Sequence, residues 1–255
     1  MLGIFDSGIG GLTVVKELLR RSPDAAFTYL GDTARTPYGT KGKETIIQYA
    51  LEDAKFLVDR GAEAMIVACN TVSAYALPAL HEQYPSLQIF DVLSPAIHAA
   101  ISAGSKQIGV IGTSATIRSG AYEQALHQAN PDLKVTSVAC PLFVPLVEEG
   151  WIDDDITRQV VARYLVPLKE LNIDVLILGC THYPILQKLI AQEMGENVLI
   201  IDSPNALMNS IQMQFPHLLN TTGDQQYWFT DDQPSTSAIA SRWLERNIEV
   251  RKANA

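Results

Sequence analysis

The fold is indicated most clearly by two similar stretches, AMIVACNT at residues 64–71 and VLILGCTH at residues 175–182. Each begins with a short apolar run that lacks polar alternation, which is typical of a strand buried on both faces of a parallel sheet. Each run passes through a small residue to a cysteine, Cys69 or Cys180, and then to hydrogen-bonding residues and a helix-like segment. Both cysteines are therefore predicted at the carboxyl ends of strands, where open α/β sheets bind their ligands.

A second pair of similar stretches supports an internal duplication. IFDS at residues 4–7 and IGTS at residues 111–114 each open one half of the chain as a strand that enters a loop. The interval from residue 4 to residue 64 is only four residues shorter than the interval from residue 111 to residue 175. We expect a duplicated α/β unit, with one cysteine in each copy.

Apolar runs alternate with helix-like segments along the whole chain. The predicted strands are residues 3–5, 26–30, 64–68, 87–90, 107–112, 133–139, 175–178 and 198–201. The predicted helices are residues 12–21, 43–60, 72–82, 119–129, 153–171, 185–194 and 205–214. This order predicts two similar doubly wound α/β domains related by a pseudo-two-fold duplication, with the active site in the cleft between them.

Two Ser-Pro pairs, at residues 94–95 and 203–204, indicate where the chain crosses between domains, because proline tends to interrupt elements. The first domain is predicted to hold residues 1–94 plus 206–255, and the second to hold residues 95–205. The late segment, residues 206–255, is assigned to the first domain because it carries core-like side chains, which are Trp228, Phe229, Ile239, Trp243 and Leu244.

The composition excludes several classes of protein. With 47% hydrophobic and 18% charged residues, the 255-residue chain can form a substantial core. A net charge of −9 without a cationic cluster argues against nucleic-acid or anionic-membrane partners. No apolar stretch approaches the length of a membrane span, and the first residues resemble a strand rather than a signal peptide. We therefore expect a cytoplasmic protein.

The cysteines favour chemistry over cross-linking. Three cysteines form no disulfide framework, and the chain has neither a CxxC pair nor zinc-ligand spacing. A thiol at a strand end lies beside the N-terminus of the next helix, which favours the thiolate. A protonated His182 would favour it further at Cys180. Cys140 precedes Pro141 outside any matched context, so we expect it to be structural.

Three loops carry further candidates, each with a structural alternative. Residues 6–11, DSGIGG, could be a plain strand–helix turn or a nucleotide loop, or Asp6 could bind an ammonium group or move a proton. Asp32 in residues 31–39 could simply cap a Pro-Tyr-Gly turn. Glu148 and Glu149 could be a solvated helix end.

Taken together, these motifs resemble the glutamate racemase family. The resemblance runs through six ordered stretches, which are GIFDSGIGGLTV (3–14), GDTARTPYG (31–39), ACNTVSA (68–74), TSATIRSGAY (113–122), ACPLFVPLVEEG (139–150) and LGCTHYPIL (178–186). The segment after about residue 206 matches less distinctly. Thr36 and residues 93–96 depart from the family pattern, and we expect neither departure to touch the chemistry.

The resemblance implies racemisation by two thiols, without pyridoxal phosphate or a metal. One cysteine removes the α-proton as thiolate and the other returns a proton to the opposite face. By the family pattern Cys69 is the base for D-glutamate and Cys180 the base for L-glutamate, assisted by Asp6 and His182 respectively. Asp32 and Glu148 match further catalytic acids. D-glutamate for peptidoglycan would be the product, and a homodimer the expected assembly.

The resemblance also carries over a substrate-binding set. Its members supply neutral donors, which suit a carboxylate that gains charge in the transition state. They are Asp6, Ser7, Tyr38, Gly39, Asn70, Thr71, Thr181 and His182, to which the second half could add Thr113, Ser114 and Thr116. Because the chain begins directly at the first strand, without the extension of members that a cell-wall precursor activates, we expect no such activation.

Three alternatives remain open at this stage. The same thiol pair would serve aspartate or a broader set of amino acids. A non-catalytic binding protein could retain the fold. A cysteine hydrolase could use Cys180 with His182, although residues two apart are poorly placed for a nucleophile–base pair, and Cys69 would be unexplained. Two sulfurs about 6–8 Å apart, flanking one α-carbon, would favour the racemase.

Overall fold

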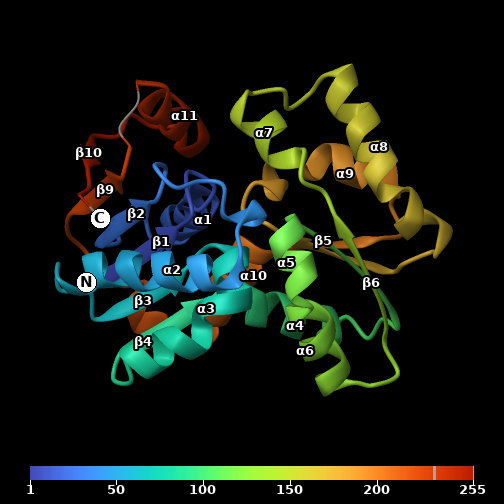
Figure 1. Cartoon of the computed structure of the whole chain (residues 1–255), viewed down its shortest axis with the longest axis horizontal. Coiled ribbons are helices and arrows are strands. Elements are labelled where there is room, and N and C mark those ends of the chain that lie inside the picture. Colours follow the sequence, from blue (N-terminus) through green and yellow to red (C-terminus); the bar gives the residue numbers. More distant parts are fainter. Residues whose placement is uncertain (232–233, 255) are drawn as a thin grey trace.

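The computed structural model describes residues 1–231 and 234–254, and it contains two open β-sheets side by side (Figure 1). The first sheet has the strand order β10-β9-β2-β1-β3-β4, and the second has β6-β5-β7-β8. All neighbouring strands pair in parallel. The strands are β1 (Leu2–Asp6), β2 (Phe27–Gly31), β3 (Ala64–Val67), β4 (Gln88–Asp91), β5 (Gln107–Gly112), β6 (Lys134–Ala139), β7 (Val175–Gly179), β8 (Leu199–Asp202), β9 (Gln225–Phe229) and β10 (Val250–Lys252).

The two sheets repeat one topology. Within the first sheet the order β2-β1-β3-β4 has the same form as β6-β5-β7-β8 in the second, so β1 corresponds to β5 and β3 to β7. These are the strands that the sequence matched. The predicted fold class, two similar doubly wound α/β domains, is confirmed.

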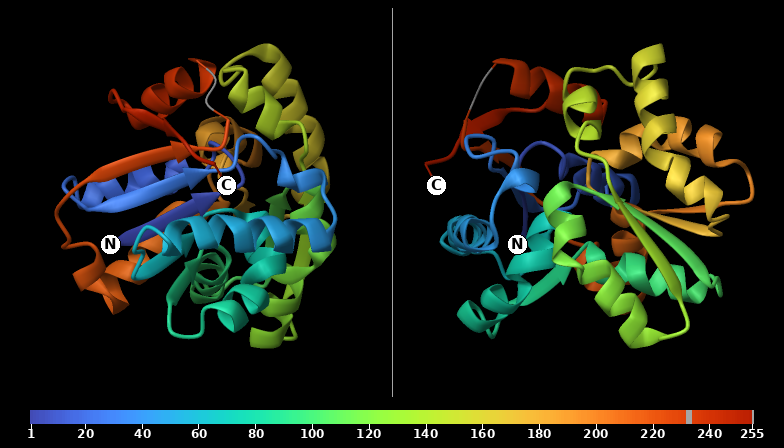
Figure 2. Two further views of the ribbon diagram at one scale, coloured as in Figure 1. Left: turned by 60° about the vertical axis from the view of Figure 1, so that its left-hand side comes forward. Right: turned by 45° about the vertical axis from the view of Figure 1, so that its right-hand side comes forward.

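Helices cover both faces of each sheet, as the apolar strands predict (Figures 1 and 2). The first half has α1 (Leu12–Arg21), η1 (Tyr38–Thr40), α2 (Lys43–Val58), α3 (Asn70–Gln83) and α4 (Leu93–Ser102). The second half has α5 (Ser114–Ser119), α6 (Ala121–Ala129), α7 (Phe143–Glu148), α8 (Asp155–Glu170), η2 (Tyr183–Leu186) and α9 (Gln187–Met194). The remainder has α10 (Ser203–Gln214), η3 (Pro216–Leu218) and α11 (Pro234–Leu244).

Three apolar clusters hold these layers together. On one face of the first sheet α1 and α10 pack against β1, while α2 and α3 pack against the other face. On the second sheet, α7, α8 and α9 cover one face, and α4 and α6 cover the other. Strands β1, β2, β3 and β7 are buried along their whole length, which explains why their sequences lack polar alternation.

The late segment returns to the first sheet. Strand β9 pairs with β2, and β10 pairs with β9. Phe229, Trp243 and Leu244 are buried there, while Trp228 and Ile239 pack against the core. The predicted domain boundaries stay a prediction, and α4 and α10 run across them. Within the described residues, no helix combines the length and apolar character needed to cross a membrane.

The structure differs from the sequence predictions at two local features. The Ser-Pro pairs do not interrupt elements but lie in the first turns of α4 and α10, where the missing proline N–H would have no partner in any case. The helix predicted over residues 119–129 corresponds to α6, and the short helix α5 that precedes it was not predicted. Gly120 separates them with φ = +67°, a left-handed conformation that glycine adopts without steric cost.

Candidate active site

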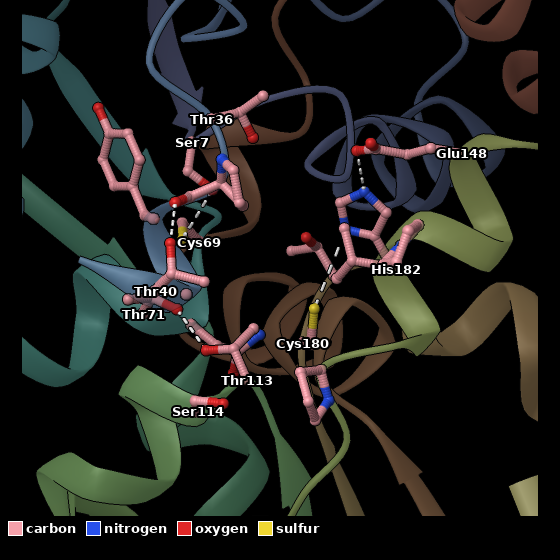
Figure 3. Close-up of a pocket in the computed structure, with 18 residues that line it drawn as sticks. Ser7, Thr36, Thr40, Cys69, Thr71, Thr113, Ser114, Glu148, Cys180 and His182 are labelled. Atoms are coloured by element: carbon pink, nitrogen blue, oxygen red, sulfur yellow. Dashed lines mark hydrogen bonds and ion pairs between the residues drawn. The ribbon is translucent and has the colours of Figure 1, made fainter. Parts of the chain in front are cut away.

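A cavity of about 320 Å³ opens where the carboxyl ends of both sheets meet (Figure 3). The first half contributes the loop after β1, the turn at residues 36–40 and the residues after β3. The second half contributes the residues after β5, helix α7 and the residues after β7. The lining residues are Ser7, Thr36, Pro37, Tyr38, Gly39, Thr40, Cys69, Asn70, Thr71, Thr113, Ser114, Pro141, Val144, Pro145, Glu148, Cys180, Thr181 and His182. The volume suits a small-molecule ligand.

Most of the predicted site residues meet in this cavity. The predicted residues that line it are Ser7, Tyr38, Gly39, Cys69, Asn70, Thr71, Thr113, Ser114, Glu148, Cys180, Thr181 and His182. Three predicted residues, Asp6, Asp32 and Thr116, are buried but do not line it. Their proximity to the cavity, and not direct contact, has to explain any role they have.

Cys69 lies in a neutral to anionic environment. It occupies the N-cap position of α3, and its thiol donates a hydrogen bond to the Ser7 hydroxyl at 3.3 Å. Burial, followed by the charge of Asp6, raises the pKa of Cys69 to about 12. The pKa of Asp6 is itself raised by burial. The N-terminus of a helix contributes only about 0.3–1 kcal/mol in favour of a thiolate, so burial outweighs it and Cys69 is a thiol at neutral pH.

The glycine-rich loop after β1 serves packing between the halves of the molecule. A Cβ on Gly10 would lie 2.3 Å from the Thr181 hydroxyl and 2.5 Å from the His182 ring. A Cβ on Gly11 would lie 2.5 Å from Asp6 Cβ. Gly10 therefore lets the first loop touch the strand end that carries Cys180, whereas Gly11 lets the loop pack against Asp6. Ser7 is the residue of this loop that lines the cavity.

Cys180 lies beside a cation. Its sulfur is 3.9 Å from His182 Nδ1, and His182 Nε2 is 2.9 Å from a Glu148 carboxylate oxygen. Burial lowers the pKa of His182, but its hydrogen bonds with Cys180 and Glu148, and their charges, raise it overall to about 10. His182 is thus an imidazolium at neutral pH. This contact is the one expected from the sequence, in which a protonated His182 favours the thiolate of Cys180.

Three threonine hydroxyls join the two halves at the cavity wall. Thr71 lies 2.9 Å from Thr113 and 3.0 Å from Thr116, and the last two are 3.0 Å apart. Thr71 lies in the first turn of α3, whereas Thr113 is the N-cap of α5 and Thr116 lies in the first turn of that helix. Because every hydroxyl can both donate and accept, this triangle can redirect its protons toward an anionic ligand.

Asp32 lies behind the cavity in a charged cluster. Its carboxylate accepts hydrogen bonds from Arg35 at 2.5 Å, from Thr230 at 2.7 Å and from the Tyr38 hydroxyl. Arg35 and Tyr38 also bond to Asp53 on α2, at 2.9 and 3.1 Å. The cluster anchors the buried ring of Tyr38, and with it the turn at residues 36–40.

Comparison with known proteins agrees with this geometry. The sequence model of the Asp/Glu/Hydantoin racemase family matches residues 12–211. A glutamate racemase of Geobacter metallireducens is 46% identical over 239 residues, which are 92% of this chain and 88% of the relative. One of Aquifex aeolicus is 45% identical over 98% of this chain and 96% of its own length. This chain belongs to the Asp/Glu/Hydantoin racemase family.

Solved structures extend the match to the whole fold. The glutamate racemase isoform RacE1 of Bacillus anthracis superposes with a TM-score of 0.93 at 39% identity, covering 100% of this chain and 97% of the other. A glutamate racemase of Francisella tularensis in complex with D-glutamate gives a TM-score of 0.90 at 37% identity, covering 99% and 97%. The protein is an amino-acid racemase, and the sequence prediction of an isomerase is confirmed.

Sequence reasoning missed part of this racemase's site. Thr36, Thr40 and three residues around α7, namely Pro141, Val144 and Pro145, line the cavity but were not among the candidates. Thr36 had been expected to lie away from the chemistry. Asp53 was also missed, although it stands at an apolar position of the buried face of α2 (Ile46, Ala50, Leu57). A charged residue in such a stripe was the available signal.

Proposed function

We propose that this racemase interconverts L- and D-glutamate with Cys69 and Cys180 as its two proton-transferring groups. The observation that carries the proposal is the placement of the two sulfurs in one cavity, on separate walls contributed by the two halves of the chain (Figure 3). Racemisation requires a proton acceptor and a proton donor on opposite faces of one carbon. In this proposal the thiol of one half supplies the proton acceptor and the thiol of the other half supplies the proton donor.

Glutamate is the substrate best supported by the relatives. Those 41–46% identical along nearly the whole chain are glutamate racemases, and the similar Francisella tularensis structure holds D-glutamate. The cavity is small, and its wall has both hydroxyls and the Cys180–His182–Glu148 chain. The imidazolium gives an anionic amino acid one favourable charge inside a protein that is acidic overall.

From L-glutamate, the Cys180 thiolate takes the α-proton, so that the Cα–H bond breaks and an S–H bond forms. The Cys69 thiol then donates its proton to the opposite face, so that its S–H bond breaks and a new Cα–H bond forms. The reaction from D-glutamate runs through the same steps in reverse. His182 stabilises the Cys180 thiolate by charge, as a cation beside a thiol does generally.

Preorganised donors lower the barrier by stabilising charge on the α-carboxylate as the carbanion forms. In the proposal Asn70, Thr71 and Thr181 provide these donors, and Ser7, Thr113 and Ser114 contribute further contacts to the substrate. Residues 38–39 meet its distal carboxylate. Enclosure by the two halves excludes water and strengthens each contact.

The four charged residues have distinct roles in this scheme. Asp6 assists Cys69, because a carboxylate near the thiol favours the protonated state that donates. His182 assists Cys180 directly, and Glu148 holds the imidazolium and orients it. Asp32 is a positioning residue, because it acts on the cavity only through Tyr38 and the turn that follows. Thr116 likewise acts through Thr71 and Thr113.

Deuterium incorporation tests the proposal. Purified protein is incubated with L-glutamate in deuterated water, and optical rotation and α-deuteration are followed together. We expect rotation to decay to zero while the α-position becomes deuterated. Full activity in both Cys69→Ser and Cys180→Ser would refute the two-thiol mechanism. Faster turnover of aspartate than of glutamate would keep the mechanism but refute the proposed substrate.

The biological setting belongs to the same proposal. D-glutamate made by this enzyme would enter peptidoglycan, and the enzyme would act in the cytoplasm as a homodimer. Loss of the gene should create a requirement for external D-glutamate in the growth medium. Light scattering on the purified chain measures the oligomeric state, and a monomeric mass at working concentration would contradict the dimer.

A further inference from the structure

Asn70 and Tyr122 meet across the two halves of the molecule behind the cavity. Asn70 is the first residue of α3, directly after Cys69, and Tyr122 lies in the first turn of α6. The Tyr122 hydroxyl donates a hydrogen bond of 2.6 Å to the Asn70 side-chain oxygen. Both side chains are 2% exposed, so water does not compete for this bond.

The other end of the Asn70 carboxamide has no partner. Its nitrogen is buried and makes no hydrogen bond among the described residues, although Asn70 lines the cavity. A buried donor without a partner carries an energetic cost. A carboxylate bound in the cavity would accept from this NH₂ group and remove the cost.

We propose that Tyr122 is a positioning residue that fixes the orientation of the Asn70 carboxamide, so that its NH₂ group faces the substrate's carboxylate. This inference rests on the proposed function, because the ligand in question is the amino-acid substrate. A flipped carboxamide would turn its oxygen toward an anionic carboxylate and its nitrogen toward the Tyr122 hydroxyl. Donation by Tyr122 to the oxygen favours the productive orientation before the substrate arrives.

The surroundings of Tyr122 make it a rigid and permanent donor. A Cβ on Gly179 would lie 3.0 Å from the Tyr122 ring and 2.8 Å from the Ile111 carbonyl oxygen. The small residue before Cys180 therefore makes room for this ring. Burial raises the pKa of Tyr122, so its hydroxyl keeps its proton throughout the physiological range.

The chain offers a matched control in Tyr75. It lies on the same helix as Asn70, and its hydroxyl donates to the Ala115 carbonyl oxygen at 3.1 Å, which also joins the two halves. Tyr75 does not line the cavity, and its hydroxyl bonds to Ala115 rather than to Asn70. Tyr75→Phe thus removes a comparable hydrogen bond between the halves without affecting the carboxamide.

The first test compares the two variants by kinetics and by calorimetric binding of D-glutamate. Tyr122→Phe should raise the Kd about 5- to 10-fold and lower kcat/KM by a similar factor, as loss of about 1 kcal/mol predicts. Tyr75→Phe should change both by less than about 2-fold. In an Asn70→Ala background, Tyr122→Phe should have no further effect, because its influence passes through Asn70.

A second measurement separates this inference from the proposed function. In the wild type without substrate, the Asn70 side-chain amide should give one pair of NMR signals, which Tyr122→Phe shifts or doubles and Tyr75→Phe leaves in place. Unchanged signals in Tyr122→Phe, or an equal loss of binding with and without Asn70, would overturn the positioning role. A wild type that does not racemise glutamate would refute the proposed function instead, and the NMR comparison would still decide the inference.

Discussion

Cys69 and Cys180 occupy equivalent places in the two sheets but differ in the charge around them. Each follows the strand next to the one that opens its half, β3 beside β1 and β7 beside β5. Cys69 is hydrogen-bonded to the neutral Ser7 and lies near the carboxylate of Asp6. Cys180 faces the His182 imidazolium, which Glu148 holds in place.

This difference shows that the duplicated fold determines where each thiol lies, whereas the neighbouring side chains determine whether that thiol is protonated. Asn70 and Thr71 follow Cys69, and Thr181 and His182 follow Cys180, so the two copies diverge from the first residue after the thiol. The resting protein then has a donor on one wall and a sulfur beside a cation on the other. In the proposed scheme this arrangement can convert L-glutamate. After one turnover the protonation states of the two cysteines are exchanged, so that Cys180 carries the proton and Cys69 is the thiolate.

The largest expected effect is loss of either thiol. Cys69→Ser and Cys180→Ser should each lower kcat for net racemisation by about 10²–10⁴-fold. The two enantiomers are equal in free energy, so kcat/KM stays equal in both directions in any variant, and asymmetry must be sought in proton exchange. Cys69→Ser should still exchange the α-proton of L-glutamate with solvent, and Cys180→Ser only that of D-glutamate. Proton NMR in deuterated water measures both, and exchange of the same enantiomer by both variants would contradict the assignment.

Removing the cation should come next in size. His182→Asn should lower kcat by about 10²-fold, because the Cys180 thiolate loses the charge that stabilises it. Glu148→Gln keeps a hydrogen-bonding group but not the charge, so its loss should be smaller. Steady-state assays on the three proteins give the ranking. A larger loss in Glu148→Gln than in His182→Asn would show that Glu148 acts on the substrate directly.

The pH dependence of stability should reveal the same cation. The pKa of His182 is raised from 6.5 to about 10 in the folded protein. Its protonation therefore stabilises the fold fully below pH 6.5, and this contribution disappears as the pH rises through 10. The difference in the free energy of unfolding between wild type and His182→Asn should shrink between pH 6.5 and 10 in urea titrations. A difference that is constant with pH would contradict a protonated His182.

The smallest effect should follow from the partner of the other thiol. Ser7→Ala removes a neutral hydrogen bond of Cys69, which is worth about 0.5–1.5 kcal/mol, so kcat should fall only about 2- to 10-fold. Comparison with His182→Asn in one assay sharpens the contrast between the two walls. Equal losses of kcat in Ser7→Ala and His182→Asn would contradict the proposed difference between the two walls.

Much of the fold could be predicted because hydrophobic burial is visible in the sequence. Strands β3 and β7 are buried on both faces, so their runs of apolar residues are uninterrupted, and the cysteines follow directly. What failed depended on single backbone positions. Gly120, in a left-handed conformation, separates α6 from the short helix α5, which was not predicted. Pro95 and Pro204 are compatible with helices only because they lie in first turns.

The site was predictable where its residues follow a strand and obscure where they meet through tertiary packing. Residues after β1, β3, β5 and β7 converge because parallel strands end at one edge. No local pattern brings Asp53 of α2 to Asp32 and Tyr38, or places the Trp243 ring edge-on against His182 with centroids 5.6 Å apart. These contacts join segments distant in sequence, and they depend on how α2 and α11 pack.

Differential alkylation of the substrate-free enzyme tests the contrast between the two thiols most directly. Cys69 and Cys180 are equally accessible, each 5% exposed, so their relative rates report on thiolate character, and the fully buried Cys140 serves as an internal control. With iodoacetamide at pH 8 and mass spectrometry of the labelled peptides, Cys180 should react well before Cys69, and Cys140 should remain unlabelled. Labelling of Cys69 at the same rate as Cys180, or faster, would contradict the account.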